Sequence, residues 1–388
     1  MLRLRGILVQ ASLAAALLAP AALRPAAAMD LNRPDVREFI ADMATRYDFD
    51  RRRLRKLLKN ARSQPAIIEA MDRPAEKAKP WFEYRGIFVN EKRIREGVEF
   101  WREHRAALER ASARTGVAPE YLVAIVGVET YYGRLTGRYR VLDALATLAF
   151  DYPARSKFFT EELEQFLLLT REIGVDPLTT RGSYAGAMGA PQFMPSNYRR
   201  YAVDAAADGH IDLWSNWDDV LTSVGNYFRQ FGWTPGEAVL DEAVLDASTA
   251  EPAVAAASAT PAEAAATTEV AAPTSPTSPT SPASLAAPVA AAAPAALDGH
   301  KLELSETVAS LRAKGLRFDS TQPAYAPALA IEAAESDGPH WRIGYRNFYV
   351  ITRYNHSAMY AMAVYELAAA VRDGVAREGA ALVSTPAP

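Results

Sequence analysis

The sequence predicts a mainly helical (α+β) protein with one small β region. Before residue 235, apolar residues recur at helical spacing between residues that begin and end helices. β-branched and aromatic residues gather later, in residues 341–354, and are typical of strand. Residues 247–297 are mostly Ala, Pro, Thr and Ser, so they cannot bury a core and are predicted to be a disordered insertion.

Residues 1–28 have the pattern of a secretory signal peptide. Arg3 and Arg5 precede an apolar stretch, and small residues follow up to Ala28. An uncleaved membrane anchor is the alternative, and inner-membrane association would then depend on this leader alone. The chain has 0 cysteines, which excludes disulfides, thiolate chemistry and a lipid-modified N-terminal cysteine.

The charge of the chain argues against nucleic acid as a partner. The formal net charge is -3, and loss of Arg3, Arg5 and Arg24 with an acid-free leader makes it -6. A polyanion would be repelled by such a protein.

Residues 29–115 are predicted to form a helical domain, completed by a C-terminal helix at about 356–372. Asp50 can cap one helix, and Asn90 can cap a long helix that runs toward Arg114. Three aromatic residues fall in a turn-rich link and are expected to serve packing: Trp81, Phe82 and Tyr84. Residues 373–388 are expected to be a flexible tail.

Glu129 is the strongest candidate for a catalytic residue. It continues the apolar stripe of Leu122, Ile125 and Val126 on a helix that Pro119 can begin and Gly133 can end. Desolvation and the partial negative charge of a helix C-terminus both disfavour ionisation of a carboxyl group. We therefore predict a raised pKa for Glu129, which suits a general acid near neutral pH.

Residues 181–196 form the second feature that indicates a binding site. This segment has three glycines, two prolines and few long aliphatic side chains, so its backbone can approach a ligand closely. A binding loop is therefore favoured over a simple connector.

Residues 204–214 follow the outline of a calcium-binding loop. Asp204, Asp208 and the backbone carbonyl of His210 stand at ligand positions, with a glycine at position six. Position three is Ala206, which offers no side-chain oxygen. A structural calcium ion and a metal-free turn therefore both remain open.

Four blocks of sequence resemble the membrane-bound lytic murein transglycosylase B family, in that family's order. The blocks are Gly127-Val-Glu-Thr130 with Gly133; Leu142-Asp-Ala-Leu-Ala-Thr-Leu148; Gly182-Ser-Tyr-Ala-Gly-Ala-Met-Gly189 with Gln192-Phe-Met-Pro-Ser196; and Phe348-Tyr-Val-Ile-Thr-Arg-Tyr-Asn-His-Ser357. The resemblance implies a lysozyme-like catalytic core at residues 116–235, a small β domain at residues 236–355 that contains the insertion, and a periplasmic location. It also implies peptidoglycan glycan strands as substrate and no cofactor for the chemistry; we expect a monomer.

The resemblance implies that Glu129 acts first as acid and then as base, without water, and leaves a 1,6-anhydromuramic acid end. Position within the motifs carries the family's substrate contacts to Ser183, Gln192, Tyr227, Arg155, Tyr354, Asn355 and Tyr360. The family's variant loop points to Asp218 as the ligand that closes the calcium site.

Two other classes of protein remain possible. A two-carboxylate hydrolase would need a second acid, and Asp143 and Asp151 are the nearest in sequence. Structural roles are commoner for residues in their positions. A catalytically silent wall-binding protein is the third class, and the intact motif around Glu129 speaks against it.

Overall fold

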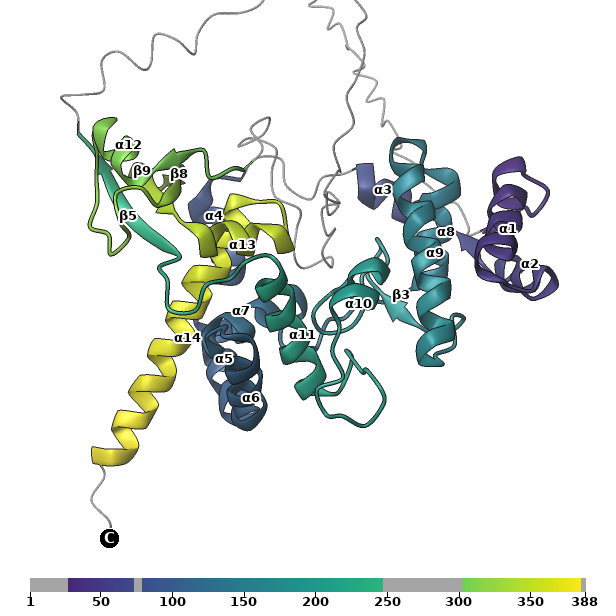
Figure 1. The fold of residues 1–388 in the computed structure, drawn as a ribbon, viewed down its shortest axis with the longest axis horizontal. Coiled ribbons are helices and arrows are strands. Elements are labelled where there is room, and N and C mark those ends of the chain that lie inside the picture. The colour runs from purple at the N-terminus through teal and green to yellow at the C-terminus, as the bar shows by residue number, and fades with distance from the viewer. Residues whose placement is uncertain (1–26, 73–78, 247–301, 385–388) are drawn as a thin grey trace, which may run out of the picture.

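The computed structural model describes residues 27–72, 79–246 and 302–384. Residues 1–26 of the predicted leader and the whole predicted insertion at 247–297 lie outside the described residues. The helix-rich architecture with a small antiparallel sheet confirms the predicted fold class (Figure 1).

The N-terminal helices pack against the middle of the chain. Asp50 caps the second of them, because its side chain accepts the N–H of Arg53 at 2.7 Å. The elements are β1 (Ala27–Ala28), α1 (Pro34–Tyr47), α2 (Arg51–Lys59), β2 (Arg62–Ser63) and α3 (Pro65–Asp72), which lie beside α8 (Val141–Asp151) and α9 (Ser156–Ile173) (Figure 1). β1 pairs with β2, so the predicted cleavage after Ala28 would remove this short strand.

The described residues between 29 and 115 are mainly helical, as predicted, and they fall into two groups that make different contacts. The second half comprises α4 (Trp81–Phe88), α5 (Glu91–Glu103) and α6 (Arg105–Thr115), and it packs with the C-terminal half of the chain rather than with α1–α3. The predicted long helix is broken at His104, and the expected turn-rich link at Trp81 is helical. The two halves separate because their apolar faces are buried against different helices.

The central helix is α7 (Pro119–Thr130), which lies among α5, α6, α11 (Trp217–Gln230) and α14 (Ala358–Ser384). Every residue from Leu122 to Thr130 is buried, so this helix is apolar on all sides, as expected for a core helix. Four shorter elements lie between α7 and α11 along the chain: β3 (Tyr139–Arg140), η1 (Pro153–Arg155), β4 (Arg181–Gly182) and α10 (Pro195–Tyr201).

A five-stranded antiparallel sheet, in the order β6-β8-β9-β5-β7, forms the β region. Its elements are β5 (Leu240–Leu245), β6 (Glu306–Thr307), α12 (Val308–Ala313), β7 (Leu316–Arg317), β8 (Pro327–Glu335) and β9 (Gly338–Gly344). Val308, Leu311 and Ile343 belong to a small core of its own, separate from the main one.

The expectation of strand up to Tyr354 is wrong, because α13 (Arg346–Tyr354) is a helix. Asn347 explains the change. Its side chain accepts the N–H of Thr234 at 2.8 Å and donates to the carbonyls of Thr234 and Glu237, which holds the start of the helix against the chain before β5. Phe348, Ile351 and Tyr354 then face the core at helical spacing.

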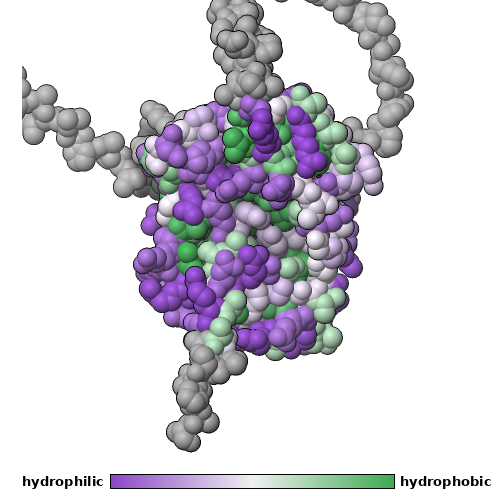
Figure 2. All heavy atoms as spheres, turned by 90° about the vertical axis from the view of Figure 1, so that its left-hand side faces the viewer, coloured by the Kyte–Doolittle hydropathy of each residue, from purple (hydrophilic) through white to green (hydrophobic). Residues whose placement is uncertain are grey.

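The expected flexible tail is also wrong over residues 373–384, because α14 continues to Ser384. Residues 372–384 contain no proline, and the two glycines, Gly374 and Gly379, do not end the helix. None of the helices in the described ranges is long and apolar enough to cross a membrane. The face that carries the sheet and α14 is mostly hydrophilic, with small separate apolar areas (Figure 2).

Candidate active site

Glu129 is completely buried, with 0% of its surface exposed. It is the last residue but one of α7. The hydroxyl of Tyr360, on α14, donates a hydrogen bond to Oε1 of Glu129 at 2.6 Å. Oε2 of Glu129 has no hydrogen-bond partner within the described part of the chain.

The buried position raises the pKa of Glu129 from its ordinary 4.5 to about 8. Desolvation is the main cause, since it disfavours the charged form, and the hydrogen bond from Tyr360 opposes it. Glu129 therefore carries its proton at neutral pH. Oε1 accepts the Tyr360 hydroxyl and Oε2 has no partner among the described residues, so Oε2 is the oxygen that can carry this proton.

A left-handed turn follows α7 directly. Tyr131, Tyr132 and Gly133 have φ angles of 52°, 60° and 80°, so two tyrosines adopt the left-handed conformation before the predicted glycine. Arg93 holds the turn: its guanidinium donates to the carbonyl of Gly127, and its own carbonyl accepts the hydroxyl of Tyr132 at 2.8 Å.

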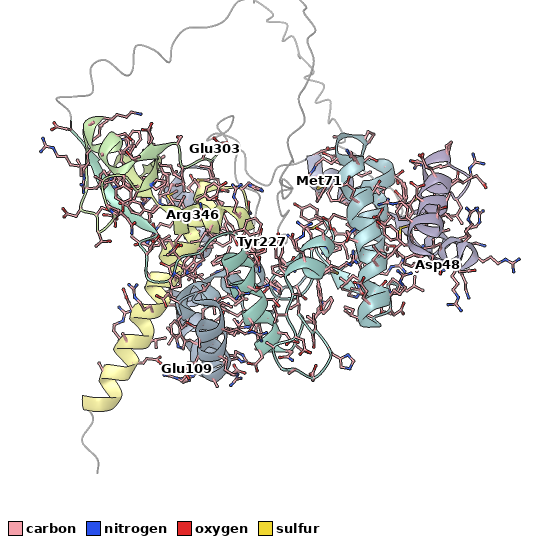
Figure 3. All side chains as sticks on the ribbon, in the orientation of Figure 1. Asp48, Met71, Glu109, Tyr227, Glu303 and Arg346 are labelled. Atoms are coloured by element: carbon pink, nitrogen blue, oxygen red, sulfur yellow. The ribbon has the colours of Figure 1, made fainter. Side chains whose placement is uncertain are left out.

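Tyr227 and Tyr354 form an aromatic cluster with Phe193 beside Glu129. The rings of the two tyrosines are 4.9 Å apart, and Phe193 lies 5.7 Å from Tyr227 and 5.9 Å from Tyr354. Burial raises the pKa of both tyrosines, and the nearby Glu129 carboxyl raises it further. Figure 3 places Tyr227 near the centre of the molecule.

The hydroxyls of both tyrosines are already bound to backbone. Tyr227 donates to the carbonyl of Arg353, and Tyr354 donates to the carbonyl of Pro191, both at 2.6 Å. With the bond from Tyr360 to Glu129, all three tyrosine hydroxyls near this carboxyl are therefore hydrogen-bonded.

Residues 181–196, the glycine-rich loop, hold Ser183 and Gln192, and both are buried. The Ser183 hydroxyl accepts the N–H groups of Ala185 and Ala187 at 3.2 and 3.0 Å, so it shapes the loop. Gln192 donates through Nε2 to the carbonyl of Gly189 at 2.8 Å, while its Oε1 has no partner among the residues described. Gln192 thus has a buried acceptor that no described residue satisfies.

Arg155 and Asn355 are less directly tied to Glu129. The guanidinium of Arg155 lies over Phe158 at 4.8 Å, and burial lowers its pKa while neighbouring Tyr152 and Tyr184 oppose this. Asn355 follows α13, is buried, and accepts the N–H of Ser357 through its backbone carbonyl at 2.7 Å.

Asp143 and Asp151 both bind residues of the N-terminal segment, residues 33–63. Asp143 pairs with Arg140 at 2.7 Å and accepts the backbone N–H of Arg62 at 2.9 Å. Asp151 pairs with Arg33 and accepts the Ser63 hydroxyl at 2.6 Å. These contacts give both acids structural roles.

The predicted calcium set of Asp204, Asp208, His210 and Asp218 is not brought together. Asp218 instead forms a bidentate ion pair with Arg110 at 2.8 and 2.9 Å, and its assignment as the closing ligand stays a prediction.

The neighbouring Asp219 takes the place facing the loop. It is buried and accepts the N–H groups of Ala205 and Asp212 at 2.8 and 2.9 Å. Asp204 likewise accepts the N–H of Gly209. Within the described ranges, no three His, Cys, Asp or Glu side chains converge to hold a metal, so these residues do not fit a built calcium site.

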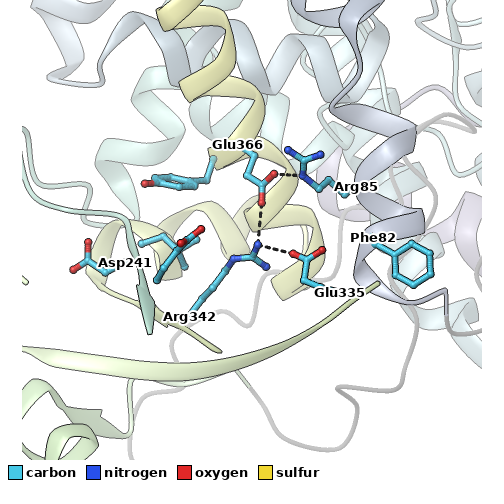
Figure 4. A pocket seen from close by; sticks show the side chains of 9 residues that line it. Phe82, Arg85, Asp241, Glu335, Arg342 and Glu366 are labelled. Atoms are coloured by element: carbon cyan, nitrogen blue, oxygen red, sulfur yellow. Dashed lines mark hydrogen bonds and ion pairs between the residues drawn. The ribbon is translucent and has the colours of Figure 1, made fainter. Parts of the chain in front are cut away.

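A cavity of about 480 Å³ lies away from Glu129, between α4, the sheet and α14. Figure 4 shows an ion-pair network on its wall, where Arg342 bridges Glu335 at 2.9 Å and Glu366 at 3.3 Å, and Arg85 also pairs with Glu366. The network joins α4 and the β8–β9 hairpin to the helix that carries Tyr360.

Sequence reasoning assigned no role to Glu162 or Thr130, which the structure places around the glycine-rich loop. Glu162 is buried on α9 and accepts the N–H and hydroxyl of Ser196 at 3.0 and 2.5 Å. It lies on the apolar stripe with Phe159, Leu163 and Phe166, so the signal that marked Glu129 was present here too. Thr130 belongs to the block Gly127-Val-Glu-Thr130, but the sequence assigned no role to its hydroxyl.

Comparison with known proteins places the chain in a family. The family model described as the transglycosylase SLT domain matches residues 32–303 and 284–369. Membrane-bound lytic murein transglycosylase B of Escherichia coli strain K12 is 37% identical over 349 residues, which cover 88% of this chain and 83% of that protein.

Solved structures agree with this match. Soluble lytic transglycosylase SltB1 from Pseudomonas aeruginosa has 41% identity and a TM-score of 0.73, with 88% of this chain and 99% of that chain covered. Escherichia coli lytic transglycosylase Slt35, solved in complex with bulgecin A and with calcium, has 35% identity and a TM-score of 0.71, with 90% and 97% covered. The chain therefore belongs to the transglycosylase SLT family, the family of the lytic murein transglycosylases.

Proposed function

We propose that this chain is a peptidoglycan lytic transglycosylase. It cleaves the β-1,4 bond between N-acetylmuramic acid and N-acetylglucosamine and leaves a 1,6-anhydromuramic acid end. The observation that carries the proposal is Glu129, a carboxyl buried among apolar residues, with one oxygen bound to Tyr360 and the other open. Family membership supplies the substrate class.

In the first half of the reaction, Glu129 is the general acid. Because its pKa is about 8, about ten in eleven molecules carry the proton at pH 7. The proton passes from Oε2 to the glycosidic oxygen while the bond from that oxygen to the anomeric carbon breaks. The carboxylate that forms keeps the hydrogen bond from Tyr360, which favours the charged form.

In the second half, the same carboxylate is the general base. The 6-hydroxyl of the muramic acid attacks the anomeric carbon, its oxygen forms the new bond, and its proton returns to Glu129. No water is consumed, and the enzyme ends in its starting protonation state. One carboxyl is sufficient because the substrate supplies the nucleophile, which agrees with the structural contacts of Asp143 and Asp151.

The remaining predicted residues would bind the glycan strand. Gln192 has an amide oxygen without a partner among the described residues, and Tyr227 and Tyr354 are aromatic residues of the kind that pack against sugars. Ser183, Arg155 and Asn355 are assigned to the glycan strand by their positions in the family's motifs. Tyr360, predicted as a substrate contact, acts on Glu129.

We further propose that the protein is exported to the periplasm by its leader and works there as a monomer. Nucleic acid is not a partner, because the chain is acidic overall. No cofactor takes part in the chemistry above. Calcium would have a structural role only, and the hydrogen-bonded loop at Asp219 argues for a turn that forms without it.

Mass spectrometry of digested peptidoglycan tests the proposal. Lytic cleavage gives muropeptides with anhydro ends, whereas a hydrolase gives reducing ends that are heavier by one water. The Glu129→Gln variant, which keeps the shape and loses the transferable proton, should release neither. Reducing ends as the main product, or substantial turnover by that variant, would contradict the proposal.

A further inference from the structure

We propose that Thr130 is a positioning residue of this active site. Its hydroxyl fixes the glycine-rich loop against the end of the helix that carries Glu129. This inference rests on the proposed function, because its effect is on the geometry in which Glu129 meets the substrate.

The hydroxyl of Thr130 makes contacts on both sides of the site. Thr130 is 0% exposed and is the final residue of α7. Its Oγ1 donates to the carbonyl of Ala190 at 2.8 Å and accepts the N–H of Gly133 at 3.0 Å. The carbonyl of Val126 also lies within 3.2 Å, but a hydroxyl has one proton, and the shorter distance favours Ala190.

The Ala190 contact helps to place the loop that carries Gln192, whose amide is also held by the carbonyls of Thr136 and Gly189. Ala190 is two residues before Gln192, and the carbonyl of the intervening Pro191 is bound by the hydroxyl of Tyr354. The N–H of Ala190 donates to the carbonyl of Leu213 at 2.7 Å, so the loop is also held from the opposite side. Thr130 is thus the link by which α7 itself sets the separation between Glu129 and this part of the loop.

The Gly133 contact secures the left-handed turn. Left-handed conformations at Tyr131 and Tyr132 cost about 1 kcal/mol each or more, and they persist only where the surroundings hold them. The hydroxyl of Thr130 accepts the N–H of Gly133, the last residue of this left-handed turn. One hydroxyl therefore constrains both the end of the catalytic helix and the loop across from it.

Thr130→Val is the informative substitution, because valine keeps the branched shape and removes the hydroxyl. It leaves the Ala190 carbonyl and the Gly133 N–H without their partner, so loop and helix can shift relative to each other. Since a misplacement of about 1 Å can cost about 100-fold in rate, we expect kcat/KM to fall by about 10- to 100-fold. The alkaline limb of the pH profile should stay in place, because the burial of Glu129 and its bond to Tyr360 are unchanged.

Two further variants separate positioning from stability. Thr130→Ser keeps the hydroxyl and should restore most of kcat/KM. Thr147→Val is the matched control, because Thr147 is equally buried and its hydroxyl also joins two segments, donating to the Asp143 carbonyl and accepting the N–H of Gln64 at 3.0 Å. It should lower the melting temperature without lowering kcat/KM of the folded enzyme.

Activity on purified peptidoglycan, with melting temperature and pH profile, decides the matter. Loss in Thr130→Val, recovery in Thr130→Ser and normal activity in Thr147→Val would support the proposal. Normal kcat/KM in a less stable Thr130→Val, or equal losses in both Thr130 variants, would overturn it. Turnover by Glu129→Gln would instead overturn the assigned role of Glu129, so the two failures are distinguishable.

Discussion

Tyr360→Phe tests how the site controls the proton of Glu129. The substitution keeps the ring and removes the one hydroxyl that reaches Oε1, at 2.6 Å, from the fully buried carboxyl. A hydrogen bond to a charged group contributes about 1.5 to 3 kcal/mol, which corresponds to a factor of about 10 to 150. Since the Tyr360 bond lowers the pKa of Glu129 from the value that burial alone would give, its loss should raise that pKa above 8.

Two effects on activity follow with a known sign. The alkaline limb of kcat/KM, near pH 8 in the unmodified enzyme, should move upward by about 1 to 2 pH units. At pH 6, where the acid is protonated in both proteins, kcat should fall by about 10- to 100-fold, because the carboxylate that forms has lost its donor.

The measurement is the rate of anhydro-muropeptide release between pH 5 and 10. Tyr198→Phe is a matched control, because Tyr198 is also buried and donates its hydroxyl to a backbone carbonyl, that of Ile211 at 2.7 Å. It should leave the alkaline limb unchanged. A limb that stays in place or moves downward in Tyr360→Phe would refute the assignment of Tyr360 as the residue that stabilises the carboxylate.

Three other predictions concern stability, the second acids and calcium. The folded pKa of Glu129 is raised from 4.5 to about 8, so the free energy of unfolding falls as pH rises through this window, by up to about 5 kcal/mol. In denaturant unfolding, Glu129→Gln should therefore gain stability relative to the unmodified protein between pH 5 and 8. A stability difference between the two proteins that does not change with pH would contradict this. Asp143→Asn breaks a largely buried pair with Arg140 and should cost about 3 kcal/mol while anhydro products continue to form; lost activity at unchanged stability would count against the structural role. Calorimetric titration of chelated protein should show no calcium binding tighter than about 1 mM, and a tighter site would show that the loop rearranges to bind the ion.

The sequence predicted best what depends on local pattern. The helix caps at Asp50 and Asn90 and the burial of Glu129 follow from residue type and spacing, and the structure has all three. Predictions that depended on which faces meet were less successful. The helix at Arg346–Tyr354 has the composition of a strand, and contacts of Asn347 with residues more than 100 positions away accompany its helical form.

The metal loop shows the same limit on a smaller scale. Asp218 and Asp219 are adjacent on α11, and only Asp218 was predicted to face the loop. The packing of α11 directs Asp218 toward Arg110 on α6 and Asp219 toward the loop backbone. A rotation of about 100° between neighbouring helical residues decides which carboxylate is available, and only the position of the helix settles it.

Sequence alone determined that an acidic residue stands in an apolar helical stripe and that a glycine-rich loop belongs to the same protein. The tertiary structure decided that this acid is neutral at pH 7 and that one of its oxygens is open. Those properties depend on the exclusion of water by four packed helices and on a tyrosine 231 residues further along the chain. A pKa is a property of the environment of a group, and the environment exists only once distant segments are packed together.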